Sequence, residues 1–174
     1  MQHKLRTGAL ASAAAVGVVI GVLGFSGAGA GAGRAATLFV PERSLDGVRL
    51  GMTPAEVTAL WGRRHGVCRN CERTTWYFNA RPFEPQGTAV TFVRGSVAQA
   101  YTVWQPTGWR TREGLSLGDQ EGRVHDLYGP LREESCDGYV ALVLGGRQTD
   151  SVFYVHRDAV WGFGLVRAGA RPCA

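Results

Sequence analysis

Two segments of the chain carry the same pattern of apolar residues and glycines, 67 residues apart. Residues 46–62 read DGVRLGMTPAEVTALWG and residues 113–129 read EGLSLGDQEGRVHDLYG, with six of 17 positions identical. In the first copy Val57, Leu60 and Trp61 form a stripe at helical spacing that ends at Gly62, a residue suited to a helix C-terminus. A repeat of this length predicts a duplicated supersecondary unit.

The helix start is stronger in the first copy than in the second. Thr53 can cap the helix, Pro54 fits the first helical position, and Glu56 can accept a hydrogen bond from the backbone of the capping residue. In the second copy we expect Asp119 to cap, while Gly122 lowers helix propensity. Helices of about nine residues are not stable alone, so each must pack on another element.

Runs rich in β-branched and aromatic residues follow each helix and predict antiparallel strands. Tight turns are expected at 94–96 and 157–158, and a linker at 105–108. Three strands are expected per copy, at 74–78, 89–93 and 97–104 and then at 139–144, 151–156 and 159–166. The predicted fold class is therefore α+β, with two tandem units that each pack a short helix, or a helix pair, on a three- to four-stranded antiparallel sheet.

The predicted domain organisation has four parts. Residues 1–30 have a short basic start, an uncharged stretch and small residues near position 30, which together predict a signal peptide. The alternative is an uncleaved N-terminal membrane anchor, since the uncharged stretch is long enough to span a bilayer. A flexible segment at 31–44 would follow, then repeat unit 1 at 45–108 and repeat unit 2 at 109–174.

Charge and cysteine content bear on the compartment and on the partners. Without residues 1–30 the formal net charge falls from +5 to +3, with 17 arginines against 14 acidic residues. The arginines are scattered, which speaks against nucleic acid as a partner. An even count of four cysteines in an exported chain predicts disulfides. Of three connectivities we favour Cys68–Cys71 with Cys136–Cys173, because it closes each half on itself.

The repeat resembles a motif of small exported α+β domains. Residues 50–57 with Leu60 and Gly62 are similar to the opening of outer-membrane assembly lipoproteins of the BamE/SmpA type. They also resemble the tandem-repeat β-lactamase inhibitory proteins, whose two-copy layout is the more similar. The resemblance implies a non-enzymatic binding or scaffolding module. The chain departs from the pattern at Asp119 and Gln120, and it has no lipobox cysteine, so the lipoprotein role does not carry over. The contact surface of the inhibitory proteins lies outside the shared motif, so no binding residue carries over.

The residues that could carry chemistry have simpler structural interpretations. His65, Cys68 and Cys71 offer three soft-metal ligands, but a zinc site would need a fourth, and a redox site would need a cysteine at a helix N-terminus. His125 is expected to be a partly exposed helix residue, and Glu133 with Glu134 a solvated loop pair. No serine nucleophile motif is present. We therefore expect no catalytic, cofactor or metal residue.

Aromatic residues are the better indication of function. Aromatic and arginine side chains build the centres of many protein interfaces. The candidate partner-binding residues are Trp76, Phe78, Tyr101, Trp104, Trp161 and Phe163. The expected function is a bacterial protein, secreted or held in the cell envelope, that binds an extracytoplasmic protein partner and contacts a membrane only through an uncleaved N-terminal segment. A membrane-anchored envelope scaffold and a secreted hydrolase are the alternatives.

Overall fold

The computed structural model describes residues 37–68, 71–78, 87–104 and 108–173. The chain divides into residues 1–33 and a unit from Arg34 to Ala174, and the described residues belong to the second. The predicted signal peptide, most of the predicted linker and residues 79–86 therefore lie outside them. No described helix is long and apolar enough to cross a membrane.

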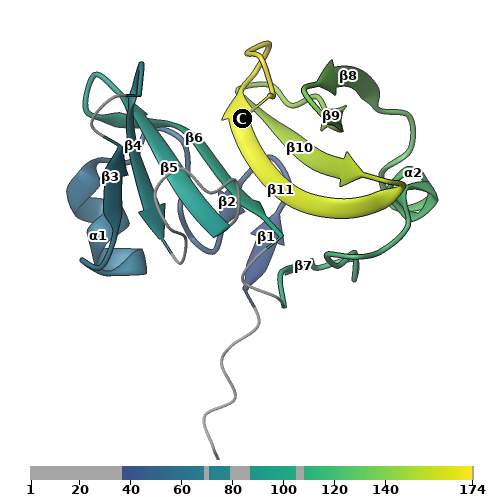
Figure 1. Ribbon diagram of the computed structural model, residues 1–174, viewed down its shortest axis with the longest axis horizontal. Coiled ribbons are helices and arrows are strands. Elements are labelled where there is room, and N and C mark those ends of the chain that lie inside the picture. The colour runs from purple at the N-terminus through teal and green to yellow at the C-terminus, as the bar shows by residue number, and fades with distance from the viewer. Residues whose placement is uncertain (1–36, 69–70, 79–86, 105–107, 174) are drawn as a thin grey trace, which may run out of the picture. The chain divides into compact units, whose positions relative to one another are not determined.

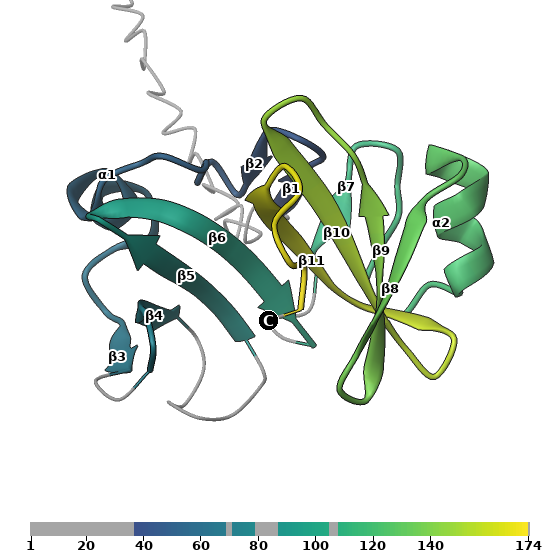
Figure 2. The same cartoon turned by 90° about the horizontal axis from the view of Figure 1, so that it is seen from above.

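Eight antiparallel strands form one continuous sheet in the order β3-β4-β5-β6-β11-β10-β9-β8 (Figures 1 and 2). Three short strands form a second sheet in the order β2-β1-β7. The two described helices are α1 (Pro54–Trp61) and α2 (Glu121–Tyr128). The strands are β1 (Leu38–Val40), β2 (Ser44–Leu45), β3 (Gly66–Cys68), β4 (Thr74–Phe78), β5 (Gly87–Val93), β6 (Ser96–Val103), β7 (Arg110–Thr111), β8 (Arg132–Cys136), β9 (Tyr139–Leu144), β10 (Thr149–His156) and β11 (Ala159–Arg167).

The predicted fold class is wrong, because the protein is mainly β and does not consist of two helix-on-sheet units. β6 and β11 are the last strands of the two repeats, and they pair with each other in antiparallel orientation. Ala100 lies opposite Leu165 and Thr102 opposite Phe163. Separate sheets would leave both long apolar strands with an unpaired edge, which is unfavourable. Pairing satisfies these backbone groups and merges the two expected sheets into one.

The sheet order is internally symmetric. Each half of the sheet consists of four strands that follow one helix in the chain. The strands β3-β4-β5-β6 run from one edge of the sheet to its centre, and the strands β8-β9-β10-β11 run from the other edge to the centre. Each central hairpin turns through residues with positive φ, Arg94 and Gly95 in one half and Arg157 and Asp158 in the other. Positive φ at both turn positions matches the right-handed twist of the flanking strands.

The N-terminal part of the described chain forms core structure. From residue 37 the expected flexible segment is wrong, since β1 and β2 are strands and Phe39 is fully buried. The Phe39 ring stacks on Phe163 with centroids 5.0 Å apart and meets Phe153 edge-on at 5.9 Å. Burial of this aromatic side chain supplies the free energy that orders the segment.

Both helices and the β2-β1-β7 sheet contribute to the core on one side of the large sheet, which we call the first face. Val57 of α1, Val124 of α2 and Phe39 of β1 belong to this buried cluster. In α2 the predicted cap is wrong: Gln120 is the N-cap, and Asp119 accepts a hydrogen bond from the Ser116 backbone N–H instead. Both helices begin and end within a residue or two of the predicted bounds.

The start of α1 forms the predicted capping box. The Thr53 hydroxyl accepts a hydrogen bond from the Glu56 backbone N–H, and the Thr53 backbone N–H donates to the Glu56 carboxylate at 2.7 Å. We expect Thr53→Ala to lower the free energy of unfolding by about 1 kcal/mol, because one helix N–H loses its partner. Urea denaturation measures this difference. Gln120→Ala is the matched control, since Gln120 makes no side-chain cap bond, and an equal loss in both variants would contradict the role of Thr53.

The opposite side of the sheet, the second face, holds a smaller buried cluster of Val103, Ala141, Val152, Tyr154 and Val166. The Tyr154 ring lies over Gly164, where an added Cβ would come within 2.7 Å of the Tyr154 hydroxyl. That hydroxyl donates to the Pro172 carbonyl at 3.0 Å, so the C-terminal segment covers the ring. The absence of a side chain at Gly164 is what allows Tyr154 to lie flat on the sheet.

The described residues contain two disulfides, and both confirm the favoured pairing. Cys68 bonds to Cys71 at the start of the first half's strands, and Cys136 bonds to Cys173 across a sequence separation of 37. The second bridge holds the C-terminal segment beside β8, where it covers the second face. Disulfides of this kind are typical of proteins in oxidising compartments and fit an extracytoplasmic protein.

Candidate functional site

The candidate partner-binding residues divide between the two faces. Phe78 and Phe163 are buried in the first-face core, and Trp76 is partly buried against the same core. These three side chains therefore stabilise the fold. Tyr101 and Trp161 pack against the second-face cluster, and Trp104 is 55% exposed. Of the six candidates, only Trp104 and Trp161 line the same cavity in the described part of the chain.

A pocket of about 770 Å³ lies at the end of the central strands. Trp104 follows β6, Tyr139 begins β9, His156 ends β10 and Trp161 lies in β11. The pocket draws on both halves of the chain because β6 and β11 are neighbours. Its lining consists of Trp104, Asp137, Gly138, Tyr139, His156, Arg157, Ala159, Trp161 and Cys173.

Trp104 has a backbone conformation that is unusual for a non-glycine residue. Its φ is 58°, and its backbone N–H donates to the Trp161 carbonyl oxygen at 2.7 Å. The left-handed region is unfavourable for a bulky residue, and residues held in such conformations cluster at functional sites. The hydrogen bond to Trp161 holds this conformation, so the indole projects at the pocket instead of continuing the β6 alternation.

Further lining residues of the pocket are aromatic side chains that pack on a buried tyrosine. The Trp161 ring lies 5.5 Å from Tyr139 and 5.9 Å from His156, measured between centroids. Behind them, Tyr139 meets the fully buried Tyr154 edge-on at 5.7 Å. A wall supported in this way keeps its shape, which lowers the entropy that binding would otherwise cost.

A hydrogen bond joins the two turns that frame the pocket. His156 Nδ1 lies 2.8 Å from the Gly138 carbonyl oxygen. Since a carbonyl oxygen only accepts, Nδ1 is the donor and carries a proton. The β8–β9 turn and the β10–β11 turn are thereby fixed to each other at one rim of the pocket.

The pocket has a mixed and moderate charge. Asp137 and Arg157 place one carboxylate and one guanidinium among the lining residues. Burial raises the pKa of the nearby Tyr154 hydroxyl far above its usual range, so this phenol stays neutral. Cys173 is oxidised in its disulfide and offers no thiolate. The lining is therefore suited to apolar and hydrogen-bonding contact, with a charge of either sign at the rim.

A second pocket of about 250 Å³ adjoins the first and shares four of its lining residues. It extends toward Leu117 and Gly118, in the loop before α2. That loop is fixed to β11, because the Gly118 N–H donates to the Val160 carbonyl at 2.8 Å and the Val160 N–H donates to Asp119. Trp104 lines both pockets, as do His156, Ala159 and Trp161.

The zinc and redox alternatives concerned Cys68 and Cys71, with His65 as a third possible ligand. The two sulfur atoms are bonded to each other, and the pair lies at β3, the edge of the sheet, rather than at a helix N-terminus. His65 stacks on Trp76 with centroids 3.9 Å apart. The disulfide and the stacked rings therefore stabilise the edge of the sheet in the first half of the chain.

Sequence reasoning missed the residues that complete the pocket. Tyr139, His156 and Arg157 stand at predicted strand or turn positions, and Asp137 lies just before the predicted strand at 139–144. Nothing in the local pattern brings them to Trp104, which lies more than 30 residues away in the chain. The one available signal was the pair of tight turns around Gly138 and Arg157, which end neighbouring strands at the same side of the sheet.

No family model and no curated protein matches the chain. An extracellular protein containing an SCP domain from Bacillus anthracis, solved at 1.5 Å, is similar with 12% identity and a TM-score of 0.47. The match covers 67% of this chain and 43% of that one, so this chain spans less than half of that protein's length. A DUF4309 family protein (YjgB) from Bacillus subtilis is similar at 12% identity and a TM-score of 0.44, over 66% and 78% of the two chains. Likenesses at this level carry no functional argument.

Proposed function

We propose that this protein is an exported, non-enzymatic binding module that holds a protein partner in the pocket beside Trp104. The observation that carries the proposal is the 55% exposed indole of Trp104, held at φ 58° over an aromatic pocket of about 770 Å³. An exposed aromatic side chain at the edge of a largely apolar pocket is typical of a binding site.

The composition of the pocket supports a protein partner. Trp, Tyr and Arg are the residues most enriched at the energetic centres of protein interfaces, and Trp104, Tyr139, Trp161 and Arg157 supply them here. A pocket of this kind accepts one large apolar side chain of the partner as an anchor. The resemblance of residues 50–62 to exported binding modules, given above, points to the same class of function.

Covalent capture from the pocket rim tests the proposal. A photoreactive side chain is placed at Arg157, and in a matched control at Arg94, the corresponding exposed turn residue of the first half with the same φ of 52°. Irradiation of cells that export the full chain should give a discrete adduct with one protein from position 157 and none from position 94. Mass spectrometry of the adduct identifies the partner.

A second variant ties the capture to the pocket. Trp104→Ala should weaken binding of the captured partner by about 30-fold or more, since an interface tryptophan commonly contributes 2 kcal/mol or more. Isothermal titration calorimetry with the purified partner measures the loss. Equal capture from positions 94 and 157, or an affinity unchanged by Trp104→Ala, would overturn the proposal.

A further inference from the structure

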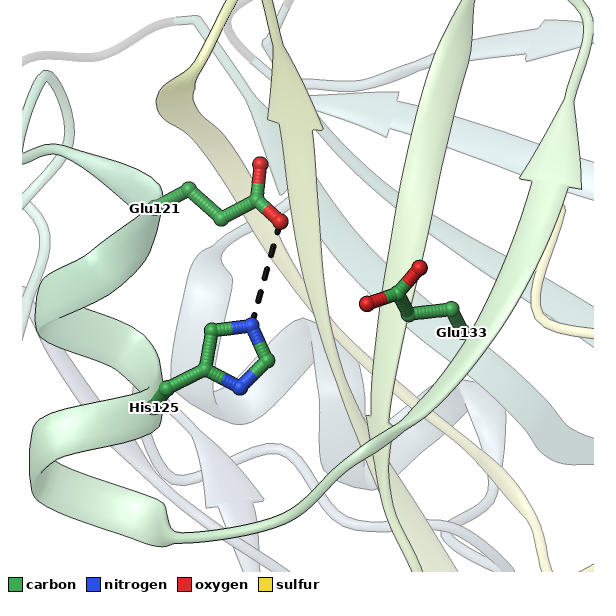
Figure 3. A group of neighbouring side chains, drawn as sticks. All are labelled: Glu121, His125 and Glu133. Atoms are coloured by element: carbon green, nitrogen blue, oxygen red, sulfur yellow. Dashed lines mark ion pairs between the residues drawn. The ribbon is translucent and has the colours of Figure 1, made fainter.

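Three potential metal ligands converge between α2 and the edge strand β8. Glu121 and His125 lie four residues apart on α2, which places them on one face of the helix. Figure 3 shows their side chains facing each other, while the Glu133 carboxylate is directed from β8 toward the same gap. The sequence interpretation treated Glu133 as a loop residue, which is wrong because it lies in β8.

The distances are compatible with direct ligation. His125 Nε2 lies 3.8 Å from Glu121 Oε1, and one ligand atom from each of the three residues lies within 4.8 Å of the others. Around a zinc ion with bonds of about 2.0–2.1 Å, neighbouring ligand atoms are separated by about 3.3 Å. Closing the site therefore needs shifts of at most about 1.5 Å, which side-chain rotation of these partly or fully exposed residues allows.

Apart from the Glu121–His125 pair, no ion pair compensates the carboxylates of the cluster in the described part of the chain. The nearby arginines pair with other acids: Arg132 with Glu134 at 2.8 Å and Arg123 with Asp119 at 3.6 Å. Within the described residues, no arginine pairs with Glu121 or Glu133. Two carboxylates directed at one gap repel each other, and a divalent cation between them removes that repulsion.

We propose that Glu121, His125 and Glu133 form a binding site for one divalent transition-metal ion of the zinc class. One imidazole nitrogen with two carboxylate oxygens suits Zn²⁺, Co²⁺ or Ni²⁺ better than Mg²⁺ or Ca²⁺, which prefer oxygen ligands alone. Water would complete the coordination. The ion would join α2, a short helix with no side-chain cap, to the edge of the large sheet.

Zinc titration of the full chain, prepared without a histidine tag, tests the site. Calorimetry should show saturable binding of one Zn²⁺ per chain, weakened at least about tenfold by His125→Ala and by Glu133→Gln. Glu134→Gln is the matched control, since Glu134 is the next residue of β8 and pairs with Arg132. This control should bind zinc as the unaltered chain does.

A second measurement keeps the proposal testable if a variant folds poorly. In the unaltered chain, Zn²⁺ should shift the ring nitrogen resonances of His125 and leave those of His156 unchanged, as observed by NMR. No saturable zinc binding, equal binding by Glu133→Gln, or no response of the His125 ring would overturn the proposal. The group would then be an ion pair on the α2 surface with a carboxylate nearby.

Discussion

Replacing Phe163 with alanine is expected to lower the free energy of unfolding by about 3–5 kcal/mol. Phe163 is fully buried in the central strand β11, stacks on Phe39 at 5.0 Å and meets Phe153 edge-on at 6.1 Å. Its loss leaves a cavity where the small sheet packs on the large one. The loss of dispersion contacts around that cavity adds to the lost hydrophobic burial.

Trp104→Ala is the control for this measurement, because Trp104 is another large aromatic candidate and is exposed. Its cost in free energy of unfolding should stay below about 1 kcal/mol. Guanidinium denaturation followed by circular dichroism compares the two variants. A cost below about 1 kcal/mol for Phe163→Ala would contradict the central position of this residue. The pair of variants also separates folding from binding, since only Trp104 is proposed to contact a partner.

Removing the Cys136–Cys173 disulfide, by Cys136→Ser with Cys173→Ser, is expected to cost about 4 kcal/mol. The bridge closes a sequence separation of 37 residues, so its absence frees a large loop in the unfolded chain. It also releases the C-terminal segment whose Pro172 carbonyl accepts the Tyr154 hydrogen bond. Cys173 lines the pocket, so partner binding should weaken as well.

The Cys68–Cys71 bridge provides the internal comparison. Its sequence separation is only 3, and the same chain-entropy relation gives about 2 kcal/mol for its loss through Cys68→Ser with Cys71→Ser. Chemical denaturation without reductant measures both double variants. An equal or smaller cost for the loss of the Cys136–Cys173 bridge would contradict the account of the C-terminal segment.

The elements that could be predicted from the sequence are those determined by residues close together in the chain. The capping box at Thr53 and the glycine after Trp61 set the limits of α1 within the sequence itself. The strands at β4, β5, β6, β9, β10 and β11 follow from β-branched and aromatic runs between turn residues. The disulfide pairing was predictable because each bridge joins two cysteines of the same half of the chain.

The elements that sequence reasoning missed are edge or tertiary features. β8 reads Arg-Glu-Glu-Ser-Cys, a charged pattern that protects a sheet edge and resembles a loop. β1 has only three residues and becomes a strand because Phe39 inserts against Phe153 and Phe163, which lie more than 100 residues later. The pairing of β6 with β11 likewise joins two strands that are far apart in the sequence, and no pattern in either strand indicates its partner.

The pocket could be predicted only in part, because it too depends on contacts between residues far apart in the chain. The sequence marks Trp104 and Trp161 as aromatic residues at or near strand ends, but it does not distinguish them from Phe163. Only the arrangement of the sheet determines that Phe163 is buried in the core and that the two tryptophans line the pocket. Tyr139 and His156 join the pocket only because β9, β10 and β11 are neighbours that end at the same side. The candidate site is therefore a consequence of the merged sheet.

Antiparallel pairing of β6 with β11 is the central structural claim, since both the single sheet and the Trp104 pocket depend on it. Nuclear Overhauser effects in solution test it directly. The account predicts cross-strand contacts joining Ala100 with Leu165 and Thr102 with Phe163, together with slow exchange of the amide protons of both strands. Absence of these contacts, with rapid amide exchange along β6 and β11, would contradict it.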